Sequence, residues 1–167
     1  MPNLPNSHTC FVCGDQNPAG LRRRFQTDGA KVWTDFEGRP EQAGYNNVVH
    51  GGILSALLDE TMGWAPALHN KRMCVAVELH VEFRKSVPVG LPVTVIGHTV
   101  DGARRIWTAE GEIRDAEGTV YVRGRGRYVP ISDEQTEEVM TYLLFDGDCI
   151  APGDICRTWG ERGADPE

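Results

Sequence analysis

Apolar positions along the chain follow two different periods, and the change between them predicts the layout of the fold. Residues 51–68, GGILSALLDETMGWAPAL, carry apolar side chains too closely spaced for a half-buried strand and are rich in helix formers, so they predict a helix. Pro66 is expected to kink or end this helix. From Met73 onward the pattern changes to alternating or β-branched runs, which predict strands within residues 73–87, 91–100, 105–115 and 120–131.

Short breaks separate these four runs. They read PVG, DGA and AEG, which are turn signals short enough to join neighbouring antiparallel strands. The second half of the chain is therefore expected to form a four-strand meander. Two further strands, at 20–29 and 30–38, are expected to precede the helix as a hairpin that turns at Asp28-Gly29.

These elements together define an α+β class of fold. The long helix is apolar around much of its circumference, so we expect a curved antiparallel sheet of about six strands to wrap around it. A short helix within 132–145, with Ser132 or Asp133 as its N-cap, is expected to end at Asp146-Gly147. The length of 167 residues suits one domain. The domain is expected to consist of an N-terminal loop (1–18), a core (19–130), and a C-terminal helix and tail (131–167).

Composition and charge limit the partners that the protein is expected to have. The formal net charge of -7 gives no field that attracts phosphates, so no nucleic-acid partner is expected. The start of the chain, MPNLPNSHTCFVCGD, lacks a basic segment followed by an apolar one, and no stretch approaches the roughly 18 uncharged apolar residues of a membrane span. We expect a cytoplasmic protein with no membrane partner. The odd number of cysteines, 5, argues against a full disulfide framework.

A step of about 100° per residue divides the predicted long helix into two faces. The residues that share the large apolar face, which must be buried, are Ile53, Leu54, Leu57, Leu58, Met62, Trp64 and Ala65. The opposite face holds Gly52, Ser55, Ala56, Asp59 and Gly63. Small residues let another backbone or a ligand approach closely, so Asp59 lies on a face built for close contact, and the neighbouring acid, Glu60, lies toward its edge.

The start of the helix, His50-Gly51-Gly52, suits the binding of a carbonyl oxygen. Backbone N–H groups at a helix N-terminus lack partners within the helix and carry partial positive charge, so Gly51 and Gly52 are able to donate hydrogen bonds to a substrate. The Cα atom of Asp59 lies about 10 Å along the axis from that of Gly52. A two-fold dimer with its small-residue faces packed antiparallel would bring Asp59 of one subunit near the glycine amides of the other.

These residues carry a resemblance to a known family. The segment VVHGGILSALLDETMG, with an acid nine positions after the histidine, resembles the HGG-containing helix of the hotdog-fold acyl-CoA thioesterases, in particular the group similar to phenylacetic-acid-pathway thioesterases. The order of strands, central helix and long antiparallel meander with VELHVEFRKSVPVG resembles that family over about residues 19–130. The resemblance implies a hotdog fold and hydrolysis of an acyl-CoA thioester, without a cofactor, by a homodimer or a tetramer of two dimers.

The resemblance also assigns roles to individual residues. It implies that the amide of Gly51 or Gly52 polarises the thioester carbonyl, that His50 helps to shape the site, and that the carboxylate of Asp59, from the partner subunit, acts as nucleophile or as general base on water. Many members of the family carry Asn or Gln six residues before the histidine, where this chain has Gly44. The residues expected to position the water or the thioester instead are Gln42, Asn46 or Asn47.

Basic residues suggest where the phosphates of coenzyme A bind. Arg84 and Lys85, and the arginines of RGRGR at 123–127 with Arg125 at its centre, are candidates because Arg forks match phosphate oxygens. Alternation in VYVRGRGRYV places these arginines on one face of a strand, which equally describes a solvated surface. The remaining residues expected to contact substrate are Ser55 and Glu60.

Cys10 and Cys13 have the spacing of half a zinc site, with His8 close by. Cys149 and Cys156 are candidates for the other half, but six intervening residues are not a usual spacing. A structural metal and a redox pair stay open, while a buried loop without metal is the expectation. The segment CFVCGDQNPAGL itself resembles one that precedes the first strand in some hotdog thioesterases.

Two other functions stay open. A hydratase or dehydratase on the same fold would use a histidine and an acid for proton transfer at the β-carbon, and the central helix lacks a second well-placed pair of this kind. A non-catalytic acyl-CoA or lipid-binding module shares the fold as well. Such a module would tolerate loss of the Asp59 carboxylate without losing its ligand.

Overall fold

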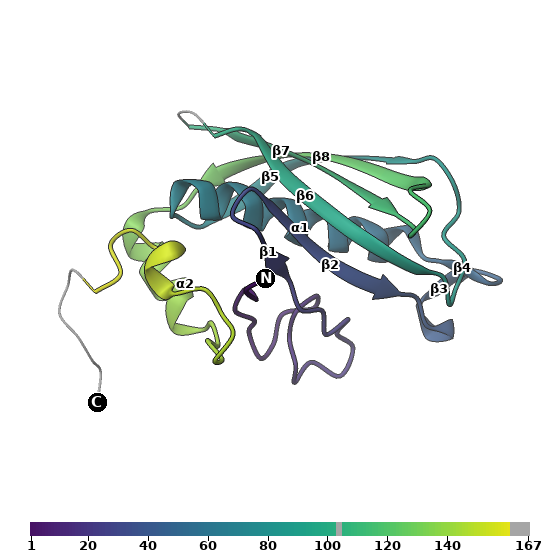
Figure 1. Ribbon diagram of the computed structural model, residues 1–167, viewed down its shortest axis with the longest axis horizontal. Coiled ribbons are helices and arrows are strands. Elements are labelled where there is room, and N and C mark those ends of the chain that lie inside the picture. Colours follow the sequence, from purple (N-terminus) through teal and green to yellow (C-terminus); the bar gives the residue numbers. More distant parts are fainter. Residues whose placement is uncertain (103–104, 161–167) are drawn as a thin grey trace.

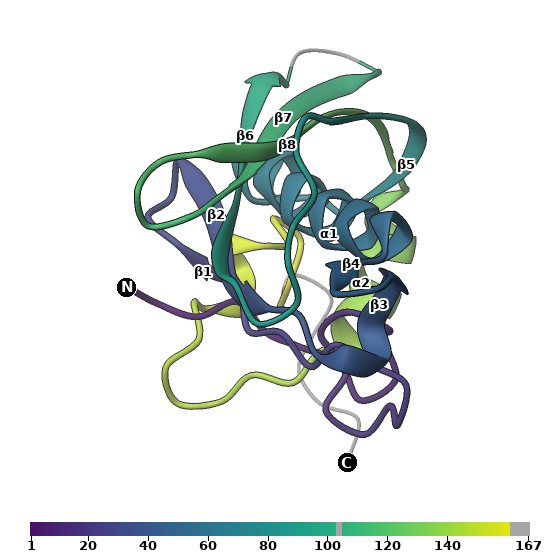
Figure 2. The same cartoon turned by 90° about the vertical axis from the view of Figure 1, so that its right-hand side faces the viewer.

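One long helix lies against one curved antiparallel sheet in the computed structural model, which describes residues 1–102 and 105–160 (Figures 1 and 2). The strands are β1 (Gln26–Thr27), β2 (Lys31–Glu37), β3 (Ala43–Tyr45), β4 (Val48–Val49), β5 (Cys74–Phe83), β6 (Pro92–Asp101), β7 (Trp107–Arg114) and β8 (Val120–Pro130). The helices are α1 (Gly51–Asn70) and α2 (Asp133–Thr141), with short 3-10 turns η1 (Pro40–Gln42) and η2 (Pro152–Asp154). Six strands form the main sheet in the order β1-β2-β6-β7-β8-β5, and β3 pairs with β4. The predicted α+β class, with about six strands around a central helix, is confirmed.

The large apolar face of α1 forms the centre of the core. Leu57, Leu58 and Met62 have no exposed surface, and the other members of this face are buried or, for Ile53, partly buried. On the small-residue face Gly52 is exposed, and Ser55, Ala56, Asp59 and Gly63 are partly exposed. The two predicted faces of the helix are therefore both present.

A row of glycines lets α1 sit close to the sheet. Gly97 of β6, Gly111 of β7 and Gly124 of β8 are direct neighbours across the three strands. A Cβ atom added to Gly111 would lie 2.9 Å from Cγ of Met62, and one added to Gly97 would lie 2.9 Å from the carbonyl oxygen of Thr61. Any side chain in this row would push the helix off the sheet.

The predicted four-strand meander is wrong in one connection. The strands β6, β7 and β8 are consecutive neighbours, but β5 pairs with β8 at the edge of the sheet, and β6 pairs with β2. The PVG segment therefore crosses between distant strands instead of turning between neighbours. Along this crossing, the N–H of Val89 donates to the oxygen of Asn47 (3.1 Å), and the N–H of Gly90 donates to the oxygen of Gly38 (2.8 Å).

The first predicted strand is much shorter than residues 20–29. Only Gln26–Thr27 pair with β2, while the turn at Asp28-Gly29 is confirmed and Gly29 has a φ of +89°. The preceding residues bond to the N-terminal loop instead, because the N–H of Leu21 donates to Phe11 (2.8 Å) and that of Arg23 donates to Val12 (2.8 Å).

Two helix ends also differ from expectation. Helix α1 runs through Pro66 to Asn70, whose side-chain amide donates to the Pro66 oxygen (2.9 Å) before Lys71 closes the helix in the left-handed conformation. A proline removes one hydrogen bond, which burial of the surrounding turns outweighs here. Helix α2 has Ser132 as its N-cap, one of the two expected caps, but it ends at Thr141, since the chain then bonds to the N-terminal segment.

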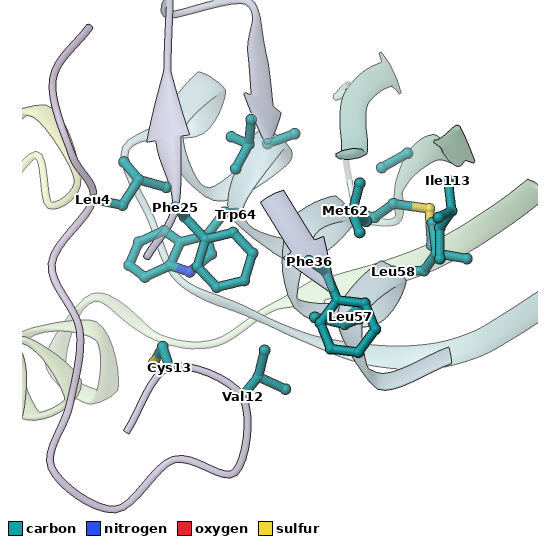
Figure 3. Close-up of a cluster of buried hydrophobic side chains, with 14 of the residues drawn as sticks. Leu4, Val12, Cys13, Phe25, Phe36, Leu57, Leu58, Met62, Trp64 and Ile113 are labelled. Carbon is teal, nitrogen blue, oxygen red and sulfur yellow. The ribbon is translucent and has the colours of Figure 1, made fainter. Parts of the chain in front are cut away.

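The N-terminal loop and the C-terminal segment cover one end of the core. Figure 3 shows Leu4, Val12 and Cys13 of the loop beside Phe25 and Trp64, and all five are buried. A further buried pair, Ile155 and Cys156, comes from the chain after η2. These segments therefore pack as part of the domain and form one wall of the candidate site described next.

Candidate active site

Asp59 is partly buried in the middle of α1, beside a tyrosine from β8. The hydroxyl of Tyr128 donates to the main-chain oxygen of Asp59 (3.1 Å) and lies 3.4 Å from its Oδ1 atom. Burial raises the pKa of the Asp59 carboxyl, and the hydrogen bond from Tyr128 opposes that rise. The hydroxyl of Ser55 donates to the oxygen of Gly51 (2.9 Å), so it does not satisfy the acid. Asp59 keeps acceptor capacity on the side that faces the adjacent hollow.

That hollow, of about 380 Å³, is enclosed by α1, β5, β8, α2 and the N-terminal loop. Its apolar lining includes Trp64, Met73 and Leu143. None of the described residues that line it is Lys, Arg or His. Its polar groups include Asp59, Glu60, the hydroxyls of Ser7, Tyr128 and Tyr142, and the thiols of Cys10, Cys13 and Cys74. We call it the acid pocket.

Glu60 lies against the N-terminal loop at one side of the acid pocket. Its Oε2 atom is 3.1 Å from Sγ of Cys10. Burial raises the pKa of the Glu60 carboxyl to about 8, with the charge of Cys10 as a second cause. Hydrogen bonding to Cys13 is the main cause that lowers the pKa of the Cys10 thiol to about 5. Burial, with the charge of Asp59 as a second cause, raises the pKa of a third pocket thiol, Cys74, to about 12.

The start of α1 is fixed by its own histidine. His50 is the N-cap, and its Nδ1 atom accepts a hydrogen bond from the N–H of Gly52 (2.9 Å). Gly44 packs against this histidine, since a Cβ atom there would lie 3.1 Å from Cα of His50. The N–H of Gly51 has no acceptor among the described residues. Of the two glycines, Gly51 is therefore the one whose amide is available to a substrate oxygen.

A second hollow, of about 330 Å³, lies at this helix start. We call it the amide pocket. Its lining includes Gly51, Leu54 and Phe83, together with the basic residues Arg84 and Lys85. The acid pocket and the amide pocket share no lining residue. At a rise of about 1.5 Å per residue, the Cα atoms of Gly51 and Asp59 are about 12 Å apart along the helix axis.

The other predicted substrate residues lie apart from both pockets. Asn46 and Asn47 are exposed and line neither one. The Gln42 side chain accepts a hydrogen bond from the N–H of Arg39 (2.9 Å) and is buried. Arg125 is exposed on the other face of the sheet, 3.4 Å from Glu110. The predicted alternation in RGRGR is confirmed. Arg123, Arg125 and Arg127 are exposed, whereas Gly124, Gly126 and Tyr128 are buried on the opposite face of β8.

Sequence reasoning missed Tyr128 and the thiols of Cys10 and Cys74 as neighbours of the two acids. Tyr128 follows the alternation of its strand, and this pattern does place it on the face that α1 covers. No local pattern indicates which helix residue its hydroxyl meets. The approach of Cys10 to Glu60 joins residues 50 positions apart, so only the folded chain shows it.

Comparison with known proteins agrees with this architecture. Residues 46–122 match the family model of the thioesterase superfamily. The structure of protein RHA08564, a thioesterase superfamily protein, is 27% identical with a TM-score of 0.68, and the match covers 73% of this chain and 63% of that one. The chain thus spans less than two thirds of that relative's length. No curated protein sequence matches the chain.

Two more distant structures share the fold. The thioesterase HI1161 from Haemophilus influenzae is 19% identical, with a TM-score of 0.64 and coverage of 72% of this chain and 85% of that one. The protein smu.793 from Streptococcus mutans UA159, solved with acetyl CoA, is 15% identical, with a TM-score of 0.60 and coverage of 65% and 87%. At these identities the likeness concerns the fold.

The fold is that of the hotdog thioesterases, a helix wrapped by an antiparallel sheet. Its central segment, residues 46–122, is similar to the thioesterase superfamily, and the rest of the likeness concerns the fold. None of the helices in the described part of the chain is long and apolar enough to cross a membrane. The phenylacetic-acid-pathway group and the cytoplasmic location stay predictions.

Proposed function

We propose that the protein hydrolyses an acyl-CoA thioester at a site that two copies of the chain share. The observation that carries this proposal is the separation of two complementary half-sites. The acid pocket holds a candidate base, Asp59, and the amide pocket holds a candidate carbonyl donor, the N–H of Gly51. One chain holds them too far apart to act on the same atom, because proton transfer needs heavy atoms within about 3 Å, or one bridging water.

The edge strand β5 connects the two half-sites. Cys74 and Ala76, near its start, line the acid pocket, whereas Phe83, at its end, lines the amide pocket. A two-fold axis near the middle of β5, between Glu78 and Leu79, would pair two copies antiparallel. This pairing would set the start of β5 in one copy beside the end of β5 in the other, and so bring together the acid pocket of one and the amide pocket of its partner.

The exposed side chains of β5 favour such pairing. The strand lies at the end of the sheet order, and several large apolar residues along it are exposed: Val75 (52%), Val77 (56%), Leu79 (37%) and Phe83 (53%). An apolar edge strand left in solvent promotes association with another strand. A second copy of this chain is the occupant that also completes the site. A tetramer of two such dimers extends the proposal.

In the proposed reaction the N–H of Gly51 donates to the thioester oxygen and stabilises the negative charge that develops there. His50 keeps the first turn in place by accepting the hydrogen bond of Gly52. As general base, Asp59 takes a proton from a water that attacks the carbonyl carbon. The C–S bond then breaks, and the proton passes to the departing sulfur, which yields free acid and coenzyme A. As nucleophile, Asp59 would form an anhydride that water cleaves in a second step.

Coenzyme A fits the charge distribution at the amide pocket. Arg84 and Lys85 line it and are exposed, so their cationic groups can meet phosphates. Two structural neighbours, smu.793 and a hypothetical thioesterase from Streptococcus pneumoniae, were solved with acetyl CoA and coenzyme A. Arg125 lies on the opposite face of the sheet and is not included in this proposal.

The first experiment is hydrolysis of a panel of short, long and aromatic acyl-CoA thioesters by the wild type and by Asp59→Asn. Thioester absorbance is followed directly, because the protein has thiols of its own. We expect turnover of at least one panel member and a loss of at least roughly a hundredfold in the variant, as expected for removal of a proton acceptor. Asp35→Asn, the same change at an exposed acid of β2 that lines neither pocket, is the matched control.

Each outcome has a defined meaning. Wild-type turnover that persists in Asp59→Asn would refute the role of Asp59. Binding of the same thioesters without turnover would favour a non-catalytic acyl-CoA module. If turnover is found, hydrolysis in labelled water during a single turnover separates the two mechanisms, since label enters the Asp59 carboxyl only by the covalent route.

A further inference from the structure

In the loop that holds Cys10 and Cys13, backbone N–H groups surround the sulfur atom of Cys10. The N–H groups of Val12 and Cys13 both donate to Sγ of Cys10, at 3.3 and 3.4 Å. The N–H of Gly14 closes the turn on the oxygen of Cys10 (2.9 Å), and a Cβ atom at Gly14 would lie 2.3 Å from that oxygen. Two N–H donors on one sulfur stabilise a thiolate more than a neutral thiol. The turn therefore presents Cys10 as a ligand.

A third ligand comes from the central helix. Oε2 of Glu60 lies 3.1 Å from Sγ of Cys10, and one ligand atom from each of Cys10, Cys13 and Glu60 lies within 4.8 Å of the other two. A tetrahedral zinc site with bonds of about 2.0–2.3 Å requires ligand atoms about 3.3–3.8 Å apart. The three groups therefore need only small side-chain adjustments to reach that geometry.

The surroundings make this cluster unusual for a purely structural acid. Glu60 is partly buried between α1 and the loop, and no Lys, Arg or His is found among the described residues that line the acid pocket. Buried carboxylates and thiolates are commonly paired with a cation or bound to a metal. A divalent cation would supply the positive charge that the described lining lacks.

We propose that Cys10, Cys13 and Glu60 bind one zinc ion, which ties the N-terminal loop to the central helix. Two sulfur ligands favour zinc over magnesium and calcium, which prefer oxygen. All three groups line the acid pocket, so a water molecule or a ligand in the pocket can take the fourth position. Glu60 then serves as a metal ligand instead of the predicted substrate contact.

The other predicted zinc ligands have different partners. The thiol of Cys149 donates to Asp146 (2.9 Å), and that of Cys156 lies 3.5 Å from the hydroxyl of Thr158. The second half of the site thus comes from Glu60, which the sequence did not connect with the CxxC segment. This inference does not depend on the proposed hydrolysis, because metal binding is measured without substrate.

Zinc binding by the full chain tests the proposal. The reduced protein is stripped with a chelator and titrated with zinc against a chromophoric competitor, for the wild type and for Cys13→Ser and Glu60→Gln. Cys74→Ser, a thiol of the same pocket outside the cluster, is the matched control. We expect one equivalent of zinc in the wild type and the control, and affinity lower by at least roughly a hundredfold in Cys13→Ser and by at least roughly tenfold in Glu60→Gln.

Cobalt substitution identifies the ligands even where a variant is less stable. We expect thiolate-to-cobalt charge-transfer absorption from two sulfurs in the wild type, with about half that intensity in Cys13→Ser because one thiolate ligand is lost. The proposal is overturned if the reduced wild type binds no zinc, or if zinc affinity and the cobalt spectrum are the same in Cys13→Ser as in the wild type. Equal weakening by Cys74→Ser and Cys13→Ser would also overturn it.

Discussion

A shared site predicts that two inactive variants restore each other. Asp59→Asn removes the candidate base from the acid pocket, and Gly51→Pro removes the candidate donor from the amide pocket. Proline is tolerated at the first position of a helix, and the preceding residue, His50, already has the extended backbone (φ -62°, ψ 131°) that a following proline requires. Gly51→Pro thus deletes one N–H group while the helix keeps its start.

Steric effects at Gly51 need their own control. A Cβ atom there would lie 3.1 Å from Cζ of Phe83, so any substitution presses on that ring. Gly51→Ala introduces the same Cβ atom but keeps the N–H group. We expect Gly51→Pro to lose about 10²–10³ in kcat, the usual effect of deleting an oxyanion donor, and Gly51→Ala to lose much less.

The two variants are then co-expressed with different tags, and the doubly tagged dimer is purified. In this mixed dimer one site carries both defects, while the other combines Asp59 of the Gly51→Pro subunit with Gly51 of the Asp59→Asn subunit. One of two sites is intact, so we expect about half of the wild-type turnover per dimer. With parents reduced by at least roughly a hundredfold, the recovery is at least about fiftyfold.

Two results would refute a shared site. A mixed dimer no more active than the mean of its parents would place both groups in one chain or exclude them from the reaction. If no doubly tagged species forms, the edge strand does not join two copies, and the shared site is refuted whatever the activity.

Three further predictions follow from contacts in the structure. Leu79→Lys sets two like charges near the proposed two-fold axis, so we expect a monomer by sedimentation, whereas Val100→Lys on β6, exposed to a similar degree (49%), stays a dimer. Tyr128→Phe removes the hydroxyl that donates to Asp59. We expect the free energy of unfolding, measured with urea, to fall by about 1 kcal/mol and kcat to be lower. Unchanged values for both would contradict the contact. Gly111→Ala presses a methyl group on Met62, so we expect it to lower the free energy of unfolding by about 1–3 kcal/mol. Gly147→Ala, with open space around it, should change this free energy little. Equal stability of the two variants would contradict the close approach of helix and sheet.

Local periodicity sufficed for the central helix and most strands, because each face of α1 is set by residues three or four positions apart. It failed where long-range pairing decides. The PVG segment looks like a turn between neighbours, but nothing in it indicates that β5 takes the far edge beside β8. The same limit explains why the row Gly97, Gly111 and Gly124 was not recognised, since its members are neighbours only after three strands align.

The strand β5 also shows why exposure cannot be inferred from alternation. Its sequence, CVAVELHVEF, alternates like a half-buried strand, yet both faces are largely exposed in one chain, and only Cys74 and Val81 are partly buried. The exposed apolar side chains of this strand thus have no cover within the single chain. If β5 pairs with a second copy, its pattern encodes an interface, and the sequence signal was correct for the assembly.

The adjacent acids in the middle of α1 take different roles because the helix separates them. Consecutive residues differ by about 100° in direction, so Asp59 turns toward Tyr128 and the open side of the pocket, while Glu60 turns toward Cys10 and the N-terminal loop. An acid in a core helix is costly unless a partner or a reaction requires it. Here one acid is placed for the reaction and the other for a metal, so Asp59→Asn should abolish turnover with zinc binding intact, and Glu60→Gln should weaken zinc binding first. Variants that lose both properties together would show that the two acids form a single site.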